Sequence, residues 1–385
     1  MVGPSLKTWR VGINAHLLSR EASYRSAGIH GYILNLLRCL PAVPEAADLQ
    51  YIAFVGQGQL ESGERLRVAR SAWPTQRPAV RVLWEQLALP WYRLDLLHGL
   101  GFVNPLLARC PSVVTVYDLS YLHYPRALPA SRRLYLHLFT RASCRRARRI
   151  IAISESTRRD LVKQWGLSPG KIGVARPGVG EHFRPLPPAQ VVEFRARRGL
   201  PDRFILHVGT LQPRKNLVRL VQAFEKLVSA GESITLVLAG DKGWMCAELL
   251  AEIERLKLTV DVLQPGFVPE EELPFWYNAA AVVAYPSLYE GFGLPVVEAM
   301  ACGTPVVASN VSAMPEAAGY GERRAALLVD PADTDAMADA LHEALTKDIL
   351  REELRVKGFQ QAATLTWFNT AADTVANYRL AMGAP

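Results

Sequence analysis

The sequence predicts an α/β protein built from two doubly wound, Rossmann-like domains. Its 385 residues suffice for two domains of ordinary size. Short apolar runs alternate with longer amphipathic stretches along the chain, which is typical of βαβ units whose parallel sheet is covered by helices on both faces. Residues 176–188 interrupt this alternation and are rich in proline and glycine, which favours an irregular linker. We therefore expect one domain over residues 1–183 and a second over residues 189–363.

The short apolar runs define the expected strands in order. The first domain has runs at 9–15, 51–55, 80–83, 94–98, 112–116 and 149–153, and the second at 204–208, 234–239, 260–263, 281–285, 305–308 and 326–329. The last segment, 364–385, has a helical pattern that does not reveal its domain. Open parallel sheets bind ligands beyond the carboxyl ends of their strands, so we expect the functional residues in the loops that follow strands.

Charge and cysteine content narrow the function classes. The formal net charge is +8, which favours an anionic partner such as a nucleotide phosphate or a lipid headgroup. No recognisable nucleic-acid module accompanies the charge, so a nucleic-acid partner is not expected. Five scattered cysteines without a CxxC pair suggest neither a disulfide framework nor a zinc ribbon. No leader-like or membrane-spanning apolar run is evident, and we expect a cytoplasmic protein.

The strongest motif is the string PSLYEGFGLPVVEAMACGTPVV at residues 286–307. It follows an expected strand and opens a helix near Pro295, where proline suits the first turn. A glycine-rich loop that enters a helix offers backbone N–H groups to an anion or to sugar hydroxyls. Glu290 in the loop and Glu298 in the helix could each accept two hydrogen bonds from vicinal hydroxyls.

A second motif, HVGTLQPRKN at residues 207–216, places two adjacent cations after a strand and a glycine turn at Gly209. Arg214 and Lys215 could clamp a diphosphate. The alternative is a plain basic helix N-terminus, but cations there oppose the helix dipole and favour a bound anion.

Three further patterns are weaker. Gly28 lies in a glycine-containing stretch, residues 26–32, between the first strand and an amphipathic helix. Asp118 follows the strand at 112–116 and could either face the reaction centre or cap the next turn. Asp333-Thr334-Asp335 formally matches a metal-binding Asp-x-Asp motif, but a helix N-cap with a first-turn acid is the better interpretation. We therefore expect no metal site.

The string at 286–307 resembles the Glu-x7-Glu signature of retaining glycosyltransferases of family 4, and the resemblance covers nearly the whole chain. It implies the GT-B fold: two facing Rossmann-like domains with an interdomain cleft. The acceptor would bind the N-terminal domain and the nucleotide-sugar donor the C-terminal domain. The helix at 364–385 would cross back to the N-terminal domain. The resemblance also implies that no cofactor or metal is needed.

The resemblance also implies roles for individual residues. Glu298 would hold the ribose of the donor and Glu290 the transferred sugar, while Arg214 and Lys215 would neutralise the leaving diphosphate. Other donor-binding contacts would come from Gly28, Gly209, Val268, Phe292, Gly293 and Leu294.

On the acceptor side, many similar sequences have histidine at the position of Tyr117. Asp118 is then the preferred polar group at the reaction centre, and His123 is a weaker candidate.

The substrate follows from a narrower resemblance. Residues 113–125, with Trp84-Glu85-Gln86 and residues 95–98, resemble a bacterial subgroup that acts on polysaccharide or O-antigen precursors. This favours GDP-mannose as donor, with UDP as the second choice of nucleotide, and a glycan or lipid-linked saccharide as acceptor. The arginine-rich stretch 132–149 could contact an anionic membrane at its inner face or could be an ordinary solvated helix.

Two alternatives stay open at this stage: a nucleotide-sugar epimerase of the same fold, and a catalytically silent nucleotide-sugar binding protein. A dinucleotide-dependent dehydrogenase is disfavoured, because no Gly-x-Gly-x-x-Gly opens a helix with an acid about 20 residues further on.

Overall fold

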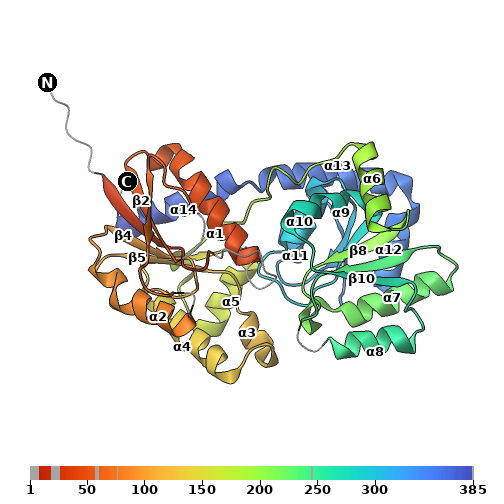
Figure 1. Cartoon of the computed structure of the whole chain (residues 1–385), viewed down its shortest axis with the longest axis horizontal. Helices are drawn as coiled ribbons and strands as arrows, with labels where there is room; N and C mark the ends of the chain where they lie inside the picture. Colours follow the sequence, from red (N-terminus) through yellow and green to blue (C-terminus); the bar gives the residue numbers. More distant parts are fainter. Residues whose placement is uncertain (1–7, 19–26, 57–59, 76, 244–245, 384–385) are drawn as a thin grey trace. The chain divides into compact units, whose positions relative to one another are not determined.

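The computed structural model describes residues 8–18, 27–56, 60–75, 77–243 and 246–383 (Figure 1). The chain forms two compact units. Unit 1 comprises Met1–Gly178 and Trp367–Pro385, and unit 2 comprises Val179–Thr366. The chain thus leaves unit 1 inside the proline- and glycine-rich stretch 176–188, and it returns at the start of the last helix.

In the described residues, unit 1 contains a seven-stranded parallel sheet in the order β3-β2-β1-β4-β5-β6-β7. Its strands are β1 (Trp9–Asn14), β2 (Leu49–Val55), β3 (Leu66–Arg70), β4 (Leu96–Gly99), β5 (Ser112–Val116), β6 (Arg149–Ala152) and β7 (Ile172–Val174). Val11 on β1 lies opposite Tyr51 on β2 and Leu96 on β4. The strand order therefore reverses direction between β1 and β4.

Helices cover this sheet. They are α1 (Ala27–Cys39), α2 (Pro78–Leu87), α3 (Ser120–His123), α4 (Ala130–Arg146), α5 (Glu155–Trp165) and α14 (Trp367–Met382). Local signals set the ends of α5: the Ser154 side chain accepts a hydrogen bond from the Thr157 N–H, and Gly166 ends the helix in the left-handed conformation.

The last helix, α14, belongs to unit 1 through buried polar contacts. The Tyr378 hydroxyl lies 2.7 Å from His98 Nδ1, whose other ring nitrogen lies 2.7 Å from Thr115 Oγ1. Arg379 also pairs with Asp48, which precedes β2. These contacts fix the returning helix against strands β4 and β5.

The described part of unit 2 contains a six-stranded parallel sheet in the order β10-β9-β8-β11-β12-β13. Its strands are β8 (Phe204–Val208), β9 (Thr235–Ala239), β10 (Val262–Gly266), β11 (Val282–Tyr285), β12 (Val306–Ser309) and β13 (Leu327–Val329). Its helices are α6 (Pro188–Arg198), α7 (Leu217–Ser229), α8 (Ala247–Arg255), α9 (Leu273–Ala279), α10 (Leu294–Ala301), α11 (Met314–Ala318), α12 (Thr334–Thr346) and α13 (Asp348–Thr364). Here the strand order reverses between β8 and β11.

The apolar periodicity of α7 shows how this unit buries its core. Leu220, Phe224 and Leu227 recur at helical spacing and pack into one cluster with the buried residues of β8, β9 and β12. Strand residues such as Ile205 and Leu236 are fully buried in the same cluster.

With one exception, each expected strand overlaps a strand of the structure. The exception is the expected strand at 80–83, which is wrong: these residues lie inside α2, which begins with a proline in its first turn. The short sequence Val-Arg-Val-Leu fits both the alternation of a strand and the period of a helix. Strands β3 and β7, at the two edges of the sheet, were not expected. Because β3 carries polar residues and β7 is short, neither forms a run of apolar residues.

Candidate active site

The candidate site of unit 2 lies at the carboxyl ends of β8 and β11, where the strand order reverses. Gly209 follows β8 with φ at 140°, and a Cβ there would lie 3.5 Å from Lys215 Cε. Gly240, which follows β9, packs even more closely: its Cβ would lie 2.1 Å from the Gly209 carbonyl oxygen. Both positions therefore favour glycine because of φ, and Gly240 also leaves no space for a side chain.

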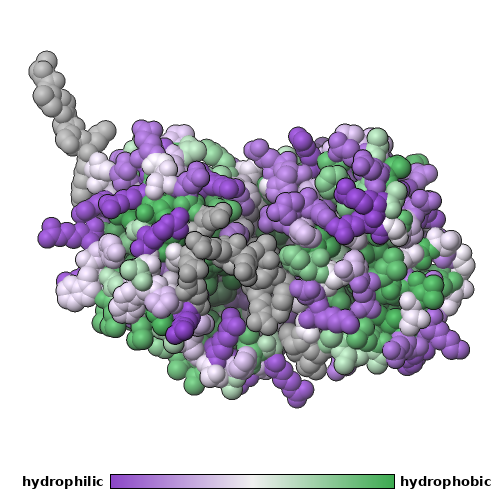
Figure 2. All heavy atoms as spheres, in the orientation of Figure 1, coloured by the Kyte–Doolittle hydropathy of each residue, from purple (hydrophilic) through white to green (hydrophobic). Residues whose placement is uncertain are grey.

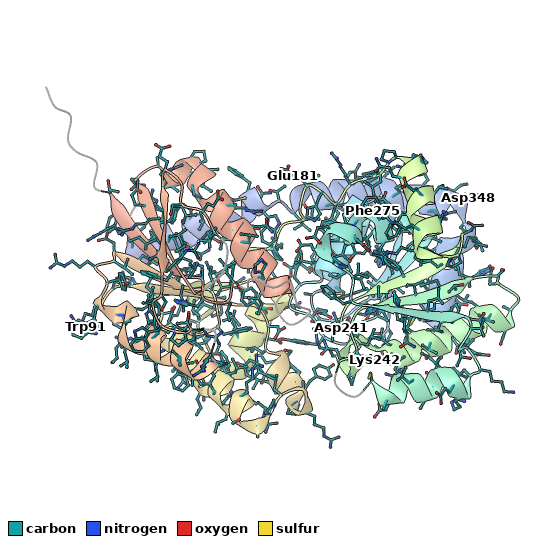
Figure 3. The ribbon with its side chains drawn as sticks, viewed as in Figure 1. Trp91, Glu181, Asp241, Lys242, Phe275 and Asp348 are labelled. Carbon is teal, nitrogen blue, oxygen red and sulfur yellow. The ribbon has the colours of Figure 1, made fainter. Side chains whose placement is uncertain are left out.

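The loop after β9 supports the loop after β8 through its backbone. The Leu211 N–H donates to the Asp241 carbonyl, and the Gly243 N–H donates back to the Leu211 carbonyl, each at 2.9 Å. Asp241 and Lys242 are labelled in this loop in Figure 3. The motif around Gly209 is thus held by its neighbour on the sheet.

Two adjacent cations and one carboxylate form the centre of the site. Arg214 and Lys215 lie in a short 3-10 turn, Pro213–Lys215, that ends at Asn216 in the left-handed conformation. Arg214 Nη1 lies 2.7 Å from Glu290 Oε2, and Lys215 Nζ lies 2.6 Å from Glu290 Oε1. The structure therefore brings together three predicted residues from two loops that are far apart in the sequence.

Backbone contacts fix this arrangement. The Leu288 N–H donates to the Arg214 carbonyl at 2.8 Å, and Arg214 Nη1 donates to the Tyr289 carbonyl at 3.0 Å. The Ser312 hydroxyl accepts from the Glu290 N–H at 3.0 Å and lies 2.7 Å from its carbonyl. The loop that carries Glu290 is thereby held on both sides.

Electrostatics keep Glu290 ionised. Glu290 is only 8% exposed, and this burial raises the pKa of its carboxyl. The positive charges of Arg214 and Lys215 outweigh burial and lower the pKa of Glu290 to about 2. Because two cations share one carboxylate, the three side chains together carry one net positive charge.

Two aromatic residues complete the cluster, and neither was expected from the sequence to have a role. The Tyr285 hydroxyl accepts from Lys215 Nζ and lies 3.4 Å from Glu290 Oε1. The His207 ring stacks on the Tyr285 ring with centroids 5.4 Å apart, and His207 Nδ1 lies 3.0 Å from the Ala284 carbonyl. Both residues lie at strand ends, where a buried aromatic in an apolar run looks like an ordinary core residue.

The glycine-rich loop enters α10 as expected. Gly293 precedes the helix with φ at 112°, and a Cβ there would lie 2.4 Å from Met314 Cε. Pro295 lies in the first turn, Leu294 begins the helix half-buried, and Phe292 is buried. Val268 lies half-buried in the loop that follows β10.

Glu298 has an environment different from that of Glu290. It lies half-buried on α10 and accepts a hydrogen bond from the Tyr277 hydroxyl at 2.7 Å. Burial raises the pKa of Glu298 to about 7, and the charge of Glu270 acts in the same direction. This carboxyl therefore titrates near neutral pH.

The structure also places the predicted residues of unit 1. Gly28 is exposed in the first turn of α1, which begins at Ala27, so the expected loop over residues 26–32 is mostly helical and Ser26 lies outside the described residues. Asp118 Oδ1 accepts from the Ser120 N–H at 2.8 Å, which is the turn-capping contact. His123 Nε2 lies 3.5 Å from Asp160.

Tyr117 occupies a structural position. Its ring is buried between Tyr32 and Phe102, and its hydroxyl donates to the Leu100 carbonyl at 2.9 Å. Burial raises its pKa well above the usual value. This hydroxyl therefore keeps its proton at neutral pH and donates it to the Leu100 carbonyl.

The Asp-x-Asp string at 333–335 is a helix start. Asp333 caps α12 by accepting from the Ala336 N–H at 2.9 Å, and Asp335 pairs with Lys226 on α7. Among the described residues, no group of three histidine, cysteine or acidic side chains is placed to hold a metal ion. In the same part of the chain, no helix is both long and apolar enough to cross a membrane.

Comparison with known proteins defines the class. The model "Glycosyltransferase Family 4" matches residues 27–182, and "Glycosyl transferases group 1" matches residues 192–361. Sucrose-phosphate synthase from Thermosynechococcus elongatus aligns with a TM-score of 0.75 at 23% identity, covering 96% of this chain and 98% of that one. Anabaena HepE in complex with UDP and glucose aligns with a TM-score of 0.73 at 18% identity, covering 96% and 99%. The fold is that of the GT-B glycosyltransferases.

Curated relatives fix the family. The O-antigen chain mannosyltransferase B of Escherichia coli is 31% identical over 375 residues, which cover 93% of this chain and 97% of that protein. A D-inositol 3-phosphate glycosyltransferase of Thermobifida fusca is 32% identical over 249 residues, 61% of this chain and 56% of that protein. The chain therefore belongs to glycosyltransferase family 4.

Proposed function

We propose that the protein is a retaining, metal-independent hexosyltransferase that moves a mannose-like sugar from a nucleoside diphosphate sugar to a hydroxyl of a glycan or lipid-linked saccharide. The observation that carries this proposal is the contact of Arg214 and Lys215 with the single carboxylate of Glu290. Positive charges near the leaving oxygen stabilise a departing diphosphate. Arg214 and Lys215 supply two such charges from one short turn.

Catalysis then rests on charge placement. When the bond between the sugar and the diphosphate breaks, negative charge develops on the leaving phosphate oxygen. Arg214 and Lys215 stabilise that charge from fixed positions, so little reorganisation is needed at the moment of reaction. The same phosphate oxygen can take the proton of the attacking acceptor hydroxyl, which enters on the face that the diphosphate leaves. Attack on that face retains the anomeric configuration.

Glu290 and Glu298 have separate parts in this scheme. Glu290 stays ionised and can exchange part of its contact with the cations for hydroxyls of the transferred sugar. Glu298, whose pKa is raised to about 7, can accept hydrogen bonds from the two ribose hydroxyls. Gly28, Gly209, Val268, Phe292, Gly293 and Leu294 would add backbone contacts to the donor.

The similar proteins support the choice of donor. Several similar proteins of Escherichia coli are mannosyltransferases, and the O-antigen chain enzyme is one of them. This similarity favours mannose as the transferred sugar of the present protein, and therefore GDP as the nucleotide. The Anabaena structures that contain UDP or UDP-glucose keep UDP as the second choice.

A membrane-facing surface in unit 1 would suit a lipid-linked acceptor. Leu83 and Leu87 are exposed one turn apart on α2, and Leu134 and Leu138 are exposed one turn apart on α4. Exposed arginines lie on α4 or just after its end: Arg132, Arg145, Arg146 and Arg148. Apolar side chains bordered by cations are the composition that favours an anionic lipid surface at the inner face of the cell membrane.

The pictures agree with this composition. In Figure 2 apolar and hydrophilic side chains are interspersed over the lower left, where Figure 1 shows α2 and α4. Trp91, labelled in Figure 3, is 68% exposed, and the Arg109 guanidinium lies 4.0 Å from the centre of its ring. A tryptophan with a bound cation also suits the boundary between water and lipid.

One experiment tests the proposed activity. The protein is incubated with GDP-mannose or UDP-glucose and a panel of α-mannosides, and the products are examined by NMR, with and without EDTA. We expect an α-linked product from the α-linked donor, at the same rate with EDTA. A β-linked product would contradict retention, and loss of activity that a divalent ion restores would contradict metal independence. Donor binding without product would favour the silent binding protein, and an epimerised nucleotide sugar would favour the epimerase.

A further inference from the structure

A second buried polar cluster lies in unit 1, away from the residues given roles above. Asn14 ends β1 and His16 follows it, at the point where the strand order reverses between β1 and β4. In unit 2 the equivalent position, between β8 and β11, carries the cluster of Lys215 and Glu290. Open parallel sheets bind ligands at this point of reversal. The polar residues after β1 therefore lie where the topology places a ligand.

Hydrogen bonds fix the orientation of the His16 ring. The His16 backbone N–H donates to the Asn14 side chain at 3.4 Å, so the atom of Asn14 that it meets is the amide oxygen. His16 Nδ1 lies 2.9 Å from the same oxygen. Since an amide oxygen only accepts, Nδ1 carries the ring proton. The opposite nitrogen, Nε2, then presents a bare lone pair.

Glu85 extends this chain of contacts from helix α2. It is only 7% exposed, and its carboxylate accepts a hydrogen bond from the Asn14 side chain. Arg81, one turn earlier on α2, lies 3.8 Å from Glu85. The amide group of Asn14 thus donates to Glu85 and accepts from His16. A Glu85–Asn14–His16 relay sets the tautomer of the imidazole.

The neighbouring residue shows that Glu85 is unusual. Gln86 is explained by the fold alone, because its side chain accepts from the Leu106 N–H at 2.8 Å and donates to the Asn104 carbonyl at 3.3 Å. Glu85 supports no loop in this way within the part of the chain that the structure describes. Burial raises its pKa, so keeping a carboxyl there costs stability that a neutral side chain would not.

The end of the relay is an unsatisfied acceptor. His16 is 7% exposed, and among the described residues its Nε2 meets no hydrogen-bond donor. The ring packs against Trp84, with centroids 4.4 Å apart. Burial, assisted by Arg81, lowers the pKa of His16 to about 4, so the ring is neutral at pH 7 and Nε2 keeps its lone pair. A buried acceptor of this kind favours a ligand that brings a hydrogen-bond donor.

We propose that His16 Nε2 accepts a hydrogen bond from a hydroxyl of the sugar acceptor, with Asn14 and Glu85 as positioning residues that hold the imidazole ring. The inference rests on the proposed function and names a residue of unit 1 that recognises the acceptor. A neutral imidazole suits an uncharged, hydroxyl-rich ligand. Both phosphates of a nucleoside diphosphate sugar are fully ionised at neutral pH and have no proton to donate, so the donor diphosphate does not fit this nitrogen.

A kinetic comparison tests the proposal with GDP-mannose as donor and methyl α-mannopyranoside as the probe acceptor. In His16→Ala we expect the KM for the acceptor to rise about tenfold, with the KM for the donor within about twofold of wild type. His16→Gln, whose side-chain oxygen can still accept, recovers part of the loss. A merely structural histidine would instead lower the melting temperature and leave the acceptor KM unchanged.

A matched control is available in the same unit. His137 on α4 also has a buried ring nitrogen, Nδ1, that meets no partner among the described residues, and its ring lies 6.2 Å from that of Trp165. His137 lies on a helix rather than at the carboxyl edge of the sheet. His137→Ala is expected to leave both KM values unchanged, and an equal rise in acceptor KM there would overturn the assignment.

A second measurement uses the wild-type protein and does not depend on turnover. The 15N resonance of His16 Nε2, assigned by its loss in His16→Gln, is followed by NMR while methyl α-mannopyranoside is added. We expect it to shift toward the value of a hydrogen-bonded nitrogen. A shift without any transfer would keep the site and refute the transferase proposal for this acceptor. Transfer without a shift, or neither, would overturn the role of His16.

Discussion

Lys215 and Glu290 form a buried ion pair across two loops of unit 2, with Nζ 2.6 Å from Oε1. The Lys215 side chain is only 6% exposed. Arg214 pairs with the other carboxylate oxygen, so that a single acid orients both cations. The sequence separates these residues by 75 positions, and the parallel sheet brings them together because β8 and β11 are neighbours. The shared carboxylate thus holds both cations in fixed positions.

The first prediction concerns the charge of Lys215. Lys215→Ala removes one of the two cations that would face the leaving diphosphate, and we expect sugar transfer to fall by about 10²- to 10³-fold. The rate at which the nucleoside diphosphate is released during sugar transfer measures this effect. Lys226→Ala is the matched control, since it removes an exposed lysine that pairs with Asp335 on the same unit. If Lys215→Ala keeps its activity, the diphosphate clamp is wrong.

Glu298 predicts how nucleotide binding depends on pH. Its pKa is raised to about 7, so the carboxyl gains protons as the pH falls from 8 to 6. Ribose hydroxyls bind better to the ionised form, and nucleotide affinity should therefore rise with pH through about 7 and level off above it. Titration calorimetry at several pH values measures this. Glu298→Gln should bind more weakly and lose the pH dependence, and an unchanged profile in that variant would remove the ribose role.

The same shift has a consequence for the free protein. Because the folded state holds the proton of Glu298 more tightly than the unfolded state, whose carboxyl has a pKa near 4.5, the folded protein binds more protons between pH 4.5 and 7. The contribution of Glu298 to stability is therefore greatest at low pH and is lost as the pH rises through about 7. In wild type, the free energy of unfolding measured with denaturant should fall as the pH rises from 4.5 to 7, and it should fall less in Glu298→Gln. An equal dependence on pH in the two proteins would contradict the raised pKa of Glu298.

Gly28 separates stability from function. It lies exposed in the first turn of α1, and no described atom lies within 4 Å of the place a Cβ would take. Gly28→Ala should leave stability unchanged or raise it by up to about 1 kcal/mol, because alanine favours a helix. If the backbone of Gly28 approaches the diphosphate, the same variant should transfer sugar more slowly. A variant that is as active as wild type would remove Gly28 from the site.

The apolar surface of α4 predicts a lipid dependence. In Leu134→Ser/Leu138→Ser we expect weaker co-sedimentation with vesicles that contain phosphatidylglycerol, since less apolar area enters the membrane. Val192→Ser/Ile349→Ser, which changes two exposed apolar residues of unit 2, is the control. Equal binding by both variants, or equal binding to vesicles of phosphatidylcholine alone, would contradict the proposed surface.

Much of the fold could be predicted because parallel strands such as β5 and β8 are short, mostly apolar runs that are fully buried. The edge strands β3 and β7 were not predicted, because an edge strand can form without a run of apolar residues. Helix α2 was predicted as a strand, because its apolar residues fit the period of a strand as well as that of a helix. The candidate site was predictable where the backbone restricts a loop sequence, as at Gly293, whose φ of 112° favours glycine.

Other parts of the site left no local signal. Tyr285 and His207 contribute through buried rings, and only the three-dimensional packing separates them from core residues. Asp118 had two local interpretations, and the structure shows the contact that caps a turn. His16 gave no motif at all, because its relay through Asn14 reaches a helix that lies far away in the sequence.

The central claim is that Arg214 and Lys215 bind the diphosphate of a sugar nucleotide. Titration calorimetry of GDP and of UDP, into the wild-type protein and into the double variant Arg214→Ala/Lys215→Ala, tests it most directly. We expect one nucleotide to bind the wild type and to lose about a hundredfold or more in affinity in the variant, which corresponds to about 2.7 kcal/mol or more. Equal affinity in the two proteins, or no binding of either nucleotide to the wild type, would contradict the claim.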